Sequence, residues 1–181
     1  MKIVIVYESM FGNTRQIAEA IADGAKDAAL VSVVNVNDIT SPVLENADVV
    51  VVGAPTHAHS LSRPSTRAEA VKEAADPAHE LALEPKAEGT GVREWLESKP
   101  PVPAFFAAFD TRADIARILS GAASTKIDRR LHGLGSKRLT DAESFLVKDN
   151  RLDEGERDRA GLWGFHLVTE AQKRAAGAHV V

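Results

Sequence analysis

The chain has 181 residues, enough for one domain with a sizeable core, and its 44% apolar and 27% charged residues are ordinary for a globular protein. The 22 Lys and Arg against 26 Asp and Glu give a net charge of −4 at pH 7, which argues against nucleic acid as a partner because phosphate backbones need clustered cations. Cysteine is absent, which excludes disulfides, thiol redox chemistry and thiolate metal sites. Any redox function must therefore depend on a bound cofactor.

The sequence also lacks an apolar run of transmembrane length. Its first residues, K-I-V-I-V-Y, are too short an apolar stretch for a signal peptide and no small-residue cleavage site follows them. We therefore expect a cytoplasmic protein with no membrane partner, folded as a single domain over residues 1–181.

Five short apolar runs predict strands. Residues 2–7 and 48–53 are continuous β-branched runs without polar alternation, which is typical of strands buried on both faces of a parallel sheet. The other predicted strands are residues 30–36, 103–109 and 144–147, the last with a possible piece around 137–139.

Helical periodicity separates these runs. Helices are predicted over residues 13–28, 66–75, 92–98, 113–134 with a break near Gly121, and 154–176. In the last one, the spacing predicts an apolar face that contains Leu162, Phe165 and Val168, with Trp163 and Leu167 flanking it. The alternation predicts an α/β fold with a doubly wound, five-stranded parallel sheet inside a three-layer α/β/α sandwich. Residues 76–91, rich in Pro, Ala and Glu, are predicted to be a polar insertion.

Ligands of such sheets bind where the strands end at their carboxyl sides. Three predicted loops there are chemically rich: residues 8–14, 54–67 and 110–112. The first offers hydroxyl and amide donors from Ser9, Asn13 and Thr14, a glycine, and the amino end of a helix, which suits a phosphate group. It has neither G-x-x-x-x-G-K-[ST] nor G-x-G-x-x-G, so we expect a monophosphate held by neutral donors. The simpler alternative is a polar turn that caps the helix.

These segments resemble those of one family. The run S-M-F-G-N-T at residues 9–14 resembles the flavodoxin phosphate loop, [ST]-x-[ST]-G-x-T, and V-V-G-A-P-T-H at 51–57 resembles the second flavin loop, which often contains G-x-P-T. F-D-T-R at 109–112 stands where the third flavin loop would be, and S-F-L-V-K-D followed by E-G-E-R resembles the end of flavodoxin-fold proteins. The resemblance covers nearly the whole chain and implies a flavodoxin-like fold, an FMN cofactor and a flavoprotein of electron transport.

The resemblance also implies a set of cofactor-binding residues in three groups. Around the 5′-phosphate it places Ser9, Met10, Phe11, Gly12, Asn13 and Thr14. Along the isoalloxazine it places Pro55, Thr56, His57, Ala58 and His59. On the other side of the ring or at its pyrimidine edge it places Phe109, Asp110, Thr111 and Arg112. No catalytic acid or base is implied, and His57 with His59 makes only half a metal site, so no metal is expected.

Two features depart from the family's pattern. Phe11 stands where the phosphate loop usually has a hydroxyl residue, so only its backbone N–H remains as a donor. Many flavodoxins enclose the ring between Trp and Tyr, whereas here Tyr7 lies in a predicted strand and Trp95 and Trp163 lie in predicted helices. Ring stacking is therefore expected to contribute less to flavin affinity.

Three functions remain open. The first is electron transfer through bound FMN to a redox partner protein or a small-molecule acceptor, by a monomer or weak dimer. The second is an oxidoreductase, an FMN-dependent enzyme acting on NAD(P)H or a quinone, in which the second substrate is served by Arg63, Arg67, Arg112, His57 and His59. The simpler interpretation of Arg63 and Arg67 is a solvated helix start. The third is a binding module that has lost affinity for flavin. Turnover of NAD(P)H by the purified protein separates the first two, and its visible spectrum tests the third.

Overall fold

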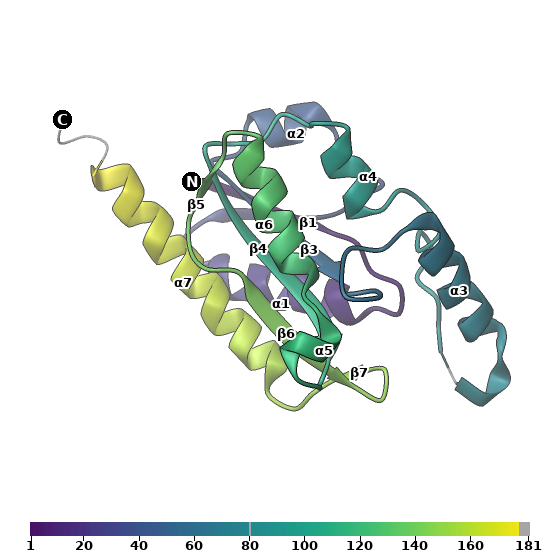
Figure 1. The fold of residues 1–181 in the computed structure, drawn as a ribbon. Coiled ribbons are helices and arrows are strands. Elements are labelled where there is room, and N and C mark those ends of the chain that lie inside the picture. Colours follow the sequence, from purple (N-terminus) through teal and green to yellow (C-terminus); the bar gives the residue numbers. More distant parts are fainter. Residues whose placement is uncertain (80, 178–181) are drawn as a thin grey trace.

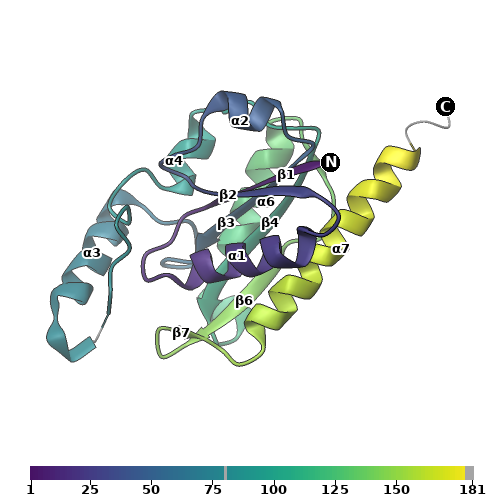
Figure 2. The same ribbon diagram turned by 180° about the vertical axis from the view of Figure 1, so that it is seen from behind.

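The sheet is built around β1 (Lys2–Tyr7) and β3 (Val49–Pro55), which pair in parallel. The strands follow one another in space in the order β2-β1-β3-β4-β6-β7, and β5 also pairs with β4 (Figures 1 and 2). The bounds of the other strands are Leu30–Asn35 for β2, Phe105–Ala113 for β4, Lys137–Arg138 for β5, Glu143–Lys148 for β6 and Arg151–Leu152 for β7.

In this computed structural model, which describes residues 1–79 and 81–177, β5 and β6 pair with opposite ends of β4 and together occupy the fifth parallel position. Strand β7 then returns antiparallel to β6. The parallel order is thus 2-1-3-4-5, which confirms the predicted doubly wound fold. The sheet has seven strands where five were predicted, because the fifth is interrupted and a hairpin is added.

Helices cover both faces of the sheet, as Figure 2 shows from behind. Helices α1 (Asn13–Ala25) and α7 (Glu156–Gly177) cover one face, where they meet Ile3 and Ile5 of β1. Helices α2 (Ser41–Glu45), α4 (Val92–Glu97) and α6 (Ala123–Gly133) pack on the other face, where Val4 and Val6 of β1 point. The remaining helices are α3 (Pro64–Ala75), the 3₁₀ turn η1 (Pro77–His79) and α5 (Arg117–Ser120).

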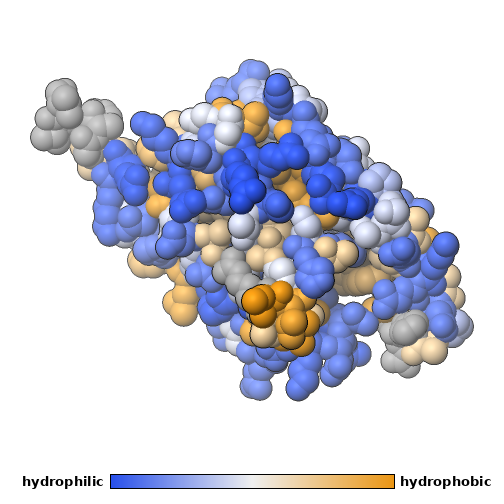
Figure 3. Space-filling view, viewed as in Figure 1, coloured by the Kyte–Doolittle hydropathy of each residue, from blue (hydrophilic) through white to orange (hydrophobic). Residues whose placement is uncertain are grey.

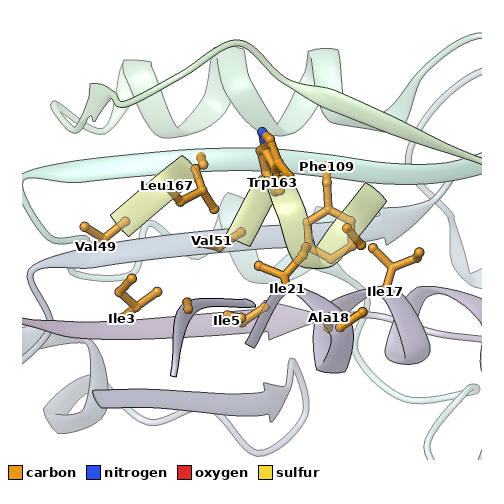
Figure 4. Packing of buried hydrophobic residues seen from close by; sticks show 14 of the residues in the cluster. Ile3, Ile5, Ile17, Ala18, Ile21, Val49, Val51, Phe109, Trp163 and Leu167 are labelled. Atoms are coloured by element: carbon orange, nitrogen blue, oxygen red, sulfur yellow. The ribbon is translucent and has the colours of Figure 1, made fainter. Parts of the chain in front are cut away.

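The core under α7 contains three aromatic rings in edge-to-face contact. Phe109 lies with its centroid 6.1 Å from that of Phe145 and 6.3 Å from that of Trp163, next to Ile17 and Ile21 of α1 (Figure 4). Such pairs contribute about 0.5–1.5 kcal/mol beyond the area they bury.

Helices α1 and α7 approach unusually closely because glycines face each other across the contact. A Cβ on Gly24 would lie 1.8 Å from the carbonyl oxygen of Gly161, and one on Gly164 would lie 2.1 Å from that of Ile21. These glycines lower the helix propensity of α7 but permit backbone-to-backbone packing, which explains why a helix with internal glycines is retained.

The predicted apolar face of α7 was wrong in part. Leu162 and Phe165 are 73% and 63% exposed, whereas Trp163 and Leu167 belong to the buried face together with Val168. The helix is rotated relative to the prediction, because Gly161 and Gly164 face α1 and the face beside them buries Trp163 and Leu167.

The insertion was predicted as polar, but part of it packs on the first loop. Leu83 and Phe11 lie against a small buried cluster of Met10, Ala70 and Ala87, and the backbone N–H of Glu84 donates to the carbonyl oxygen of Met10 at 2.8 Å. The segment of residues 81–87, which we call the strap, therefore packs against the first loop. None of the helices within residues 1–79 and 81–177 has the length and apolar character needed to cross a membrane.

Candidate functional site

The loop between β1 and α1 is closed by a glycine turn. Gly12 has a φ of +87°, a conformation that favours glycine, and its backbone N–H donates to Oγ of the buried Ser9 at 3.1 Å. The first N–H groups of α1, beginning at Asn13, have no intrahelical partners by helix geometry and carry the positive end of the helix dipole. The loop therefore presents donors suited to an anion, as the sequence predicts.

The second loop begins at the end of β3 and turns back at once. His57 and Ser60 exchange backbone hydrogen bonds of 2.8 and 3.0 Å, with Ala58 and His59 at positive φ between them. Thr56 fixes the loop to its neighbours, because its N–H donates to the carbonyl oxygen of Thr111 at 2.8 Å and its Oγ1 accepts from the N–H of Ala123 at 2.9 Å.

The predicted third loop was wrong, because residues 110–112 continue β4 as far as Ala113. Within this strand Thr111 is buried and its hydroxyl contacts that of Thr14 at 2.8 Å. The structure thus joins the first loop, the second loop and β4 through one threonine.

Phe109 and Asp110 point away from the ends of the loops. The ring of Phe109 is fully buried in the core, where it occupies the space above Gly53, since a Cβ there would lie 2.0 Å from the ring. The carboxylate of Asp110 accepts from the backbone N–H of Ser124 at 2.8 Å and so caps the start of α6, and burial raises its pKa.

A cavity of about 350 Å³ lies between the two loops and the end of β4. Ten of the predicted residues line it: Ser9, Met10, Phe11, Asn13, Thr14, Pro55, Thr56, His57, Thr111 and Arg112. Five of them do not: Gly12, Ala58, His59, Phe109 and Asp110. The sequence reasoning missed five further lining residues: Glu73, Ala113, Val147, Asp149 and Asn150.

Two of the missed residues form the turn of the β6–β7 hairpin. Asp149 and Asn150 both have positive φ, and the side-chain amide of Asn13 donates to the carbonyl oxygen of Asn150 at 2.9 Å. A two-residue Asp-Asn turn between apolar segments is a recognisable hairpin signal, so the sequence contained the information. No comparable signal marks Glu73, an exposed position of α3.

Behind the loops lies a buried network of charges. The carboxylate of Glu8, 3% exposed, accepts from the backbone N–H of Val92 at 2.8 Å and from the hydroxyl of Ser62. The guanidinium of Arg67 donates to the same hydroxyl at 3.0 Å and pairs with Glu94 at 3.1 Å. The interpretation of Arg67 as a group that meets an external substrate was therefore wrong, because it is 4% exposed and its charge is directed to Glu94.

This environment shifts two pKa values in opposite directions. Burial is the main cause that raises the pKa of Glu8, against its hydrogen bonds and the charge of Arg67. Burial, followed by the charge of Arg67, lowers the pKa of His57, so its imidazole is neutral at pH 7. The cavity thus has a neutral imidazole in its wall, and the group of three or more His, Asp or Glu that a metal would need occurs nowhere in the part of the chain that is described.

Arg112 lines the cavity beside an exposed apolar patch. Its guanidinium donates to the carbonyl oxygen of Ile115 at 2.8 Å and to Oγ of Ser120 at 3.2 Å, while Nε is buried without a partner among the described residues. Ile115, Ile118 and Leu119 are 51%, 90% and 62% exposed, and Figure 3 shows an orange patch where Figure 1 places α5.

The donor set fits the FMN that the resemblance implies. The first turn of α1 and the hydroxyl of Thr14 supply neutral donors for a phosphate, and Arg112 lines the opposite wall. The walls between them include Met10, Pro55 and Val147, which give a bound ring apolar contacts.

Comparisons with known proteins agree with this architecture. A family model described as a flavodoxin domain matches residues 4–66. A flavodoxin from the domain Archaea is 19% identical with a TM-score of 0.65, over 95% of this chain and 99% of its own. Oxidised flavodoxin 1 from Bacillus cereus is 15% identical with a TM-score of 0.65, over 93% of this chain and 98% of its own.

The fold also occurs as part of a larger protein. The rubredoxin oxygen:oxidoreductase of Desulfovibrio gigas is 17% identical with a TM-score of 0.63, over 97% of this chain but 37% of its own. A flavodoxin-domain model thus matches residues 4–66, and nearly the whole chain has the flavodoxin-like fold of these structures.

Proposed function

We propose that the protein binds FMN in the 350 Å³ cavity and transfers electrons through it. One observation carries this proposal: the anion-binding start of α1 and the ends of β3 and β4 converge on one cavity at the carboxyl edge of the sheet. This is the place where doubly wound sheets bind their ligands.

The flavin, when bound, supplies the redox chemistry, and the chain's own residues supply binding and electrostatics. The start of α1 and Thr14 would hold the phosphate, while Thr111 fixes the hydroxyl of Thr14. Arg112 adds a positive charge to the opposite wall, which favours a ligand that gains negative charge. The neutral imidazole of His57 adds no charge there and can exchange one hydrogen bond with a ligand.

Titration of the purified protein with FMN tests the proposal. We expect quenching of flavin fluorescence, saturation at one FMN per chain and reversible anaerobic bleaching of the visible bands. Thr14→Val should weaken binding by losing a hydrogen bond to a charged phosphate, worth about 1.5–3 kcal/mol. Thr40→Val, at an exposed threonine before α2, is the matched control and should leave affinity unchanged. Absence of any quenching by the wild-type protein contradicts the proposal and favours the binding module.

The alternative function, an FMN-dependent oxidoreductase acting on NAD(P)H or a quinone, is favoured by one observation. A second and larger cavity adjoins the first and shares Phe11, Asn13, Asp149 and Asn150 with it, so there is room for a second substrate. Steady turnover of NADPH and a soluble quinone by the flavin-loaded protein would support the enzyme, whereas reduction only by a partner reductase would support the carrier.

A further inference from the structure

The second cavity measures about 980 Å³ and lies beyond the amino end of α1. Four segments form it: the first loop, the start of the strap at Leu81 and Ala82, the β6–β7 hairpin and the first turn of α7. Because Phe11 and Asn13 border both cavities, an anion held at the start of α1 would lie next to both cavities.

Three cations line this second cavity: Lys148, Arg151 and Arg157. None of them forms an ion pair with another residue in the described ranges, whereas nearby Arg15 pairs with Glu84 and Arg159 pairs with Glu143. Guanidinium groups that are not engaged within the protein are suited to bind a phosphate from outside it.

Carboxylates also line the cavity, at Asp149, Asp153, Glu154 and Asp158. They oppose a ligand that carries many negative charges, such as a triphosphate, and they can accept hydrogen bonds from sugar hydroxyls. The mixture of groups therefore favours a ligand with one phosphate and a neutral, hydroxyl-bearing sugar.

An aromatic side chain completes this chemistry. Phe11 is half-buried, rests on the small cluster of Met10 and Ala87, and borders the cavity. It stands where the phosphate loop of the family usually has a hydroxyl residue, and its ring offers a face on which a purine can stack.

From this geometry we propose that the second cavity binds an adenosine phosphate next to the flavin phosphate. The inference rests on the proposed function for the identity of its neighbour. The adenosine phosphate could belong to FAD, whose AMP portion extends from the phosphate that FMN also carries, or to a free nucleotide such as NADH. The two sources share one chemistry and are separated by the experiment.

The experiment measures by calorimetry the affinities of FMN and FAD for the flavin-free protein, and those of AMP and NADH for the FMN-loaded protein. The test variant is Arg151→Ala/Arg157→Ala, and the control is Arg129→Ala/Arg174→Ala, which removes two exposed arginines from α6 and α7 elsewhere on the surface. FAD as the source predicts that FAD binds roughly tenfold tighter than FMN or better, and that only the test variant loses the difference. A free nucleotide as the source predicts saturable binding of AMP or NADH to the FMN-loaded protein, lost in the test variant alone.

The inference is overturned if FMN binds, FAD binds no tighter, and neither AMP nor NADH binds. It is also overturned if the test and control variants lose affinity equally, which would indicate a general charge effect. If neither flavin binds, the proposed function fails, and AMP added to the flavin-free protein then decides the inference: binding that the test variant loses supports it, and no binding overturns it.

Discussion

The side-chain hydroxyl of Thr14, in the first turn of α1, lies 2.8 Å from the hydroxyl of Thr111 in β4. Both residues are buried, and the carbonyl oxygen of Thr111 also accepts a hydrogen bond from the backbone N–H of Thr56. This contact connects the start of a helix on one face of the sheet with the strand that leads to the helix on the other face, and it lies in the wall of the cavity.

The pair permits a double-mutant test. Thr14→Val or Thr111→Val leaves one buried hydroxyl without a partner and should lower the free energy of unfolding by about 1–3 kcal/mol each. The double variant should be more stable than the sum of the two losses predicts, because no unpaired hydroxyl remains. Urea unfolding measures stability, and FMN affinity should stay low in the double variant, since the Thr14 hydroxyl is still missing. Additive losses would contradict the coupling.

Gly12 should resist replacement. Gly12→Ala places a Cβ at a φ of +87° and 3.2 Å from Oε1 of Glu84, so we expect a loss of about 1–2 kcal/mol in unfolding free energy and weaker FMN binding. Gly133→Ala, in a helical position with no atom within 4 Å of the new Cβ, is the control and should be neutral or slightly stabilising. Equal effects of the two substitutions in thermal unfolding would exclude a special requirement at Gly12.

Arg67 should matter for stability far more than its neighbour Arg63. Arg67→Met removes the partner of Glu94 and a charge close to buried Glu8, which should cost about 3 kcal/mol in denaturant unfolding. Arg63→Met, at an exposed position just before α3, should change stability by less than about 0.5 kcal/mol. Similar values for the two variants would show that the buried network contributes little.

The pH dependence of stability should report on Glu8. Because folding raises its pKa above the usual 4.5, the folded protein binds more protons than the unfolded chain above that pH. The stabilisation from protonated Glu8 is therefore complete below about 4.5 and is lost as pH rises through the raised pKa. As the pH rises through this window, the unfolding free energy of the wild type should fall relative to that of Glu8→Gln.

The comparison with Glu8→Gln also cancels the contributions of the other buried titratable groups to the pH dependence of stability. Asp110, whose pKa is raised, acts in the same direction as Glu8, and His57, whose pKa is lowered, acts in the opposite direction near 6.5. Both remain in Glu8→Gln, so a difference that does not vary with pH would assign the titration to them.

Arg112 should set the reduction potential of the bound flavin. Arg112→Met removes a positive charge from the cavity wall and should lower the potential, on the order of 30 mV for a two-electron couple, or about 1.4 kcal/mol. Arg112→Lys should restore part of the difference, and Arg129→Met, on the exposed surface of α6, should have no effect in the same anaerobic titration. An unchanged potential in Arg112→Met would remove Arg112 from the proposed electrostatics.

The strands and most helices could be predicted because they depend on local patterns. Continuous β-branched runs identified β1 and β3, and the glycine and polar residues of the first loop identified the start of α1. The end of β4 could not be placed in this way, because Asp110 and Thr111 are polar residues inside a buried strand and have their partners in α6 and α1.

The site showed the same division. The residues of the first loop and Pro55–His57 were found from motifs, and most of them line the cavity. The ring of Phe109 lies in the space above Gly53, and the guanidinium of Arg67 pairs with the carboxylate of Glu94, which is 27 positions away in the sequence. Contacts between distant residues leave no local pattern, so sequence reasoning could not recover them.

The close contact between Gly24 and Gly161 also affects the position of α1 relative to the cavity. A methyl group at Gly24 would lie 1.8 Å from the carbonyl oxygen of Gly161 and would force the backbones of α1 and α7 apart, and α1 carries at its other end the N–H groups that face the cavity. A substitution at Gly24, which lies outside this cavity, would therefore tilt the axis of the helix that points at it.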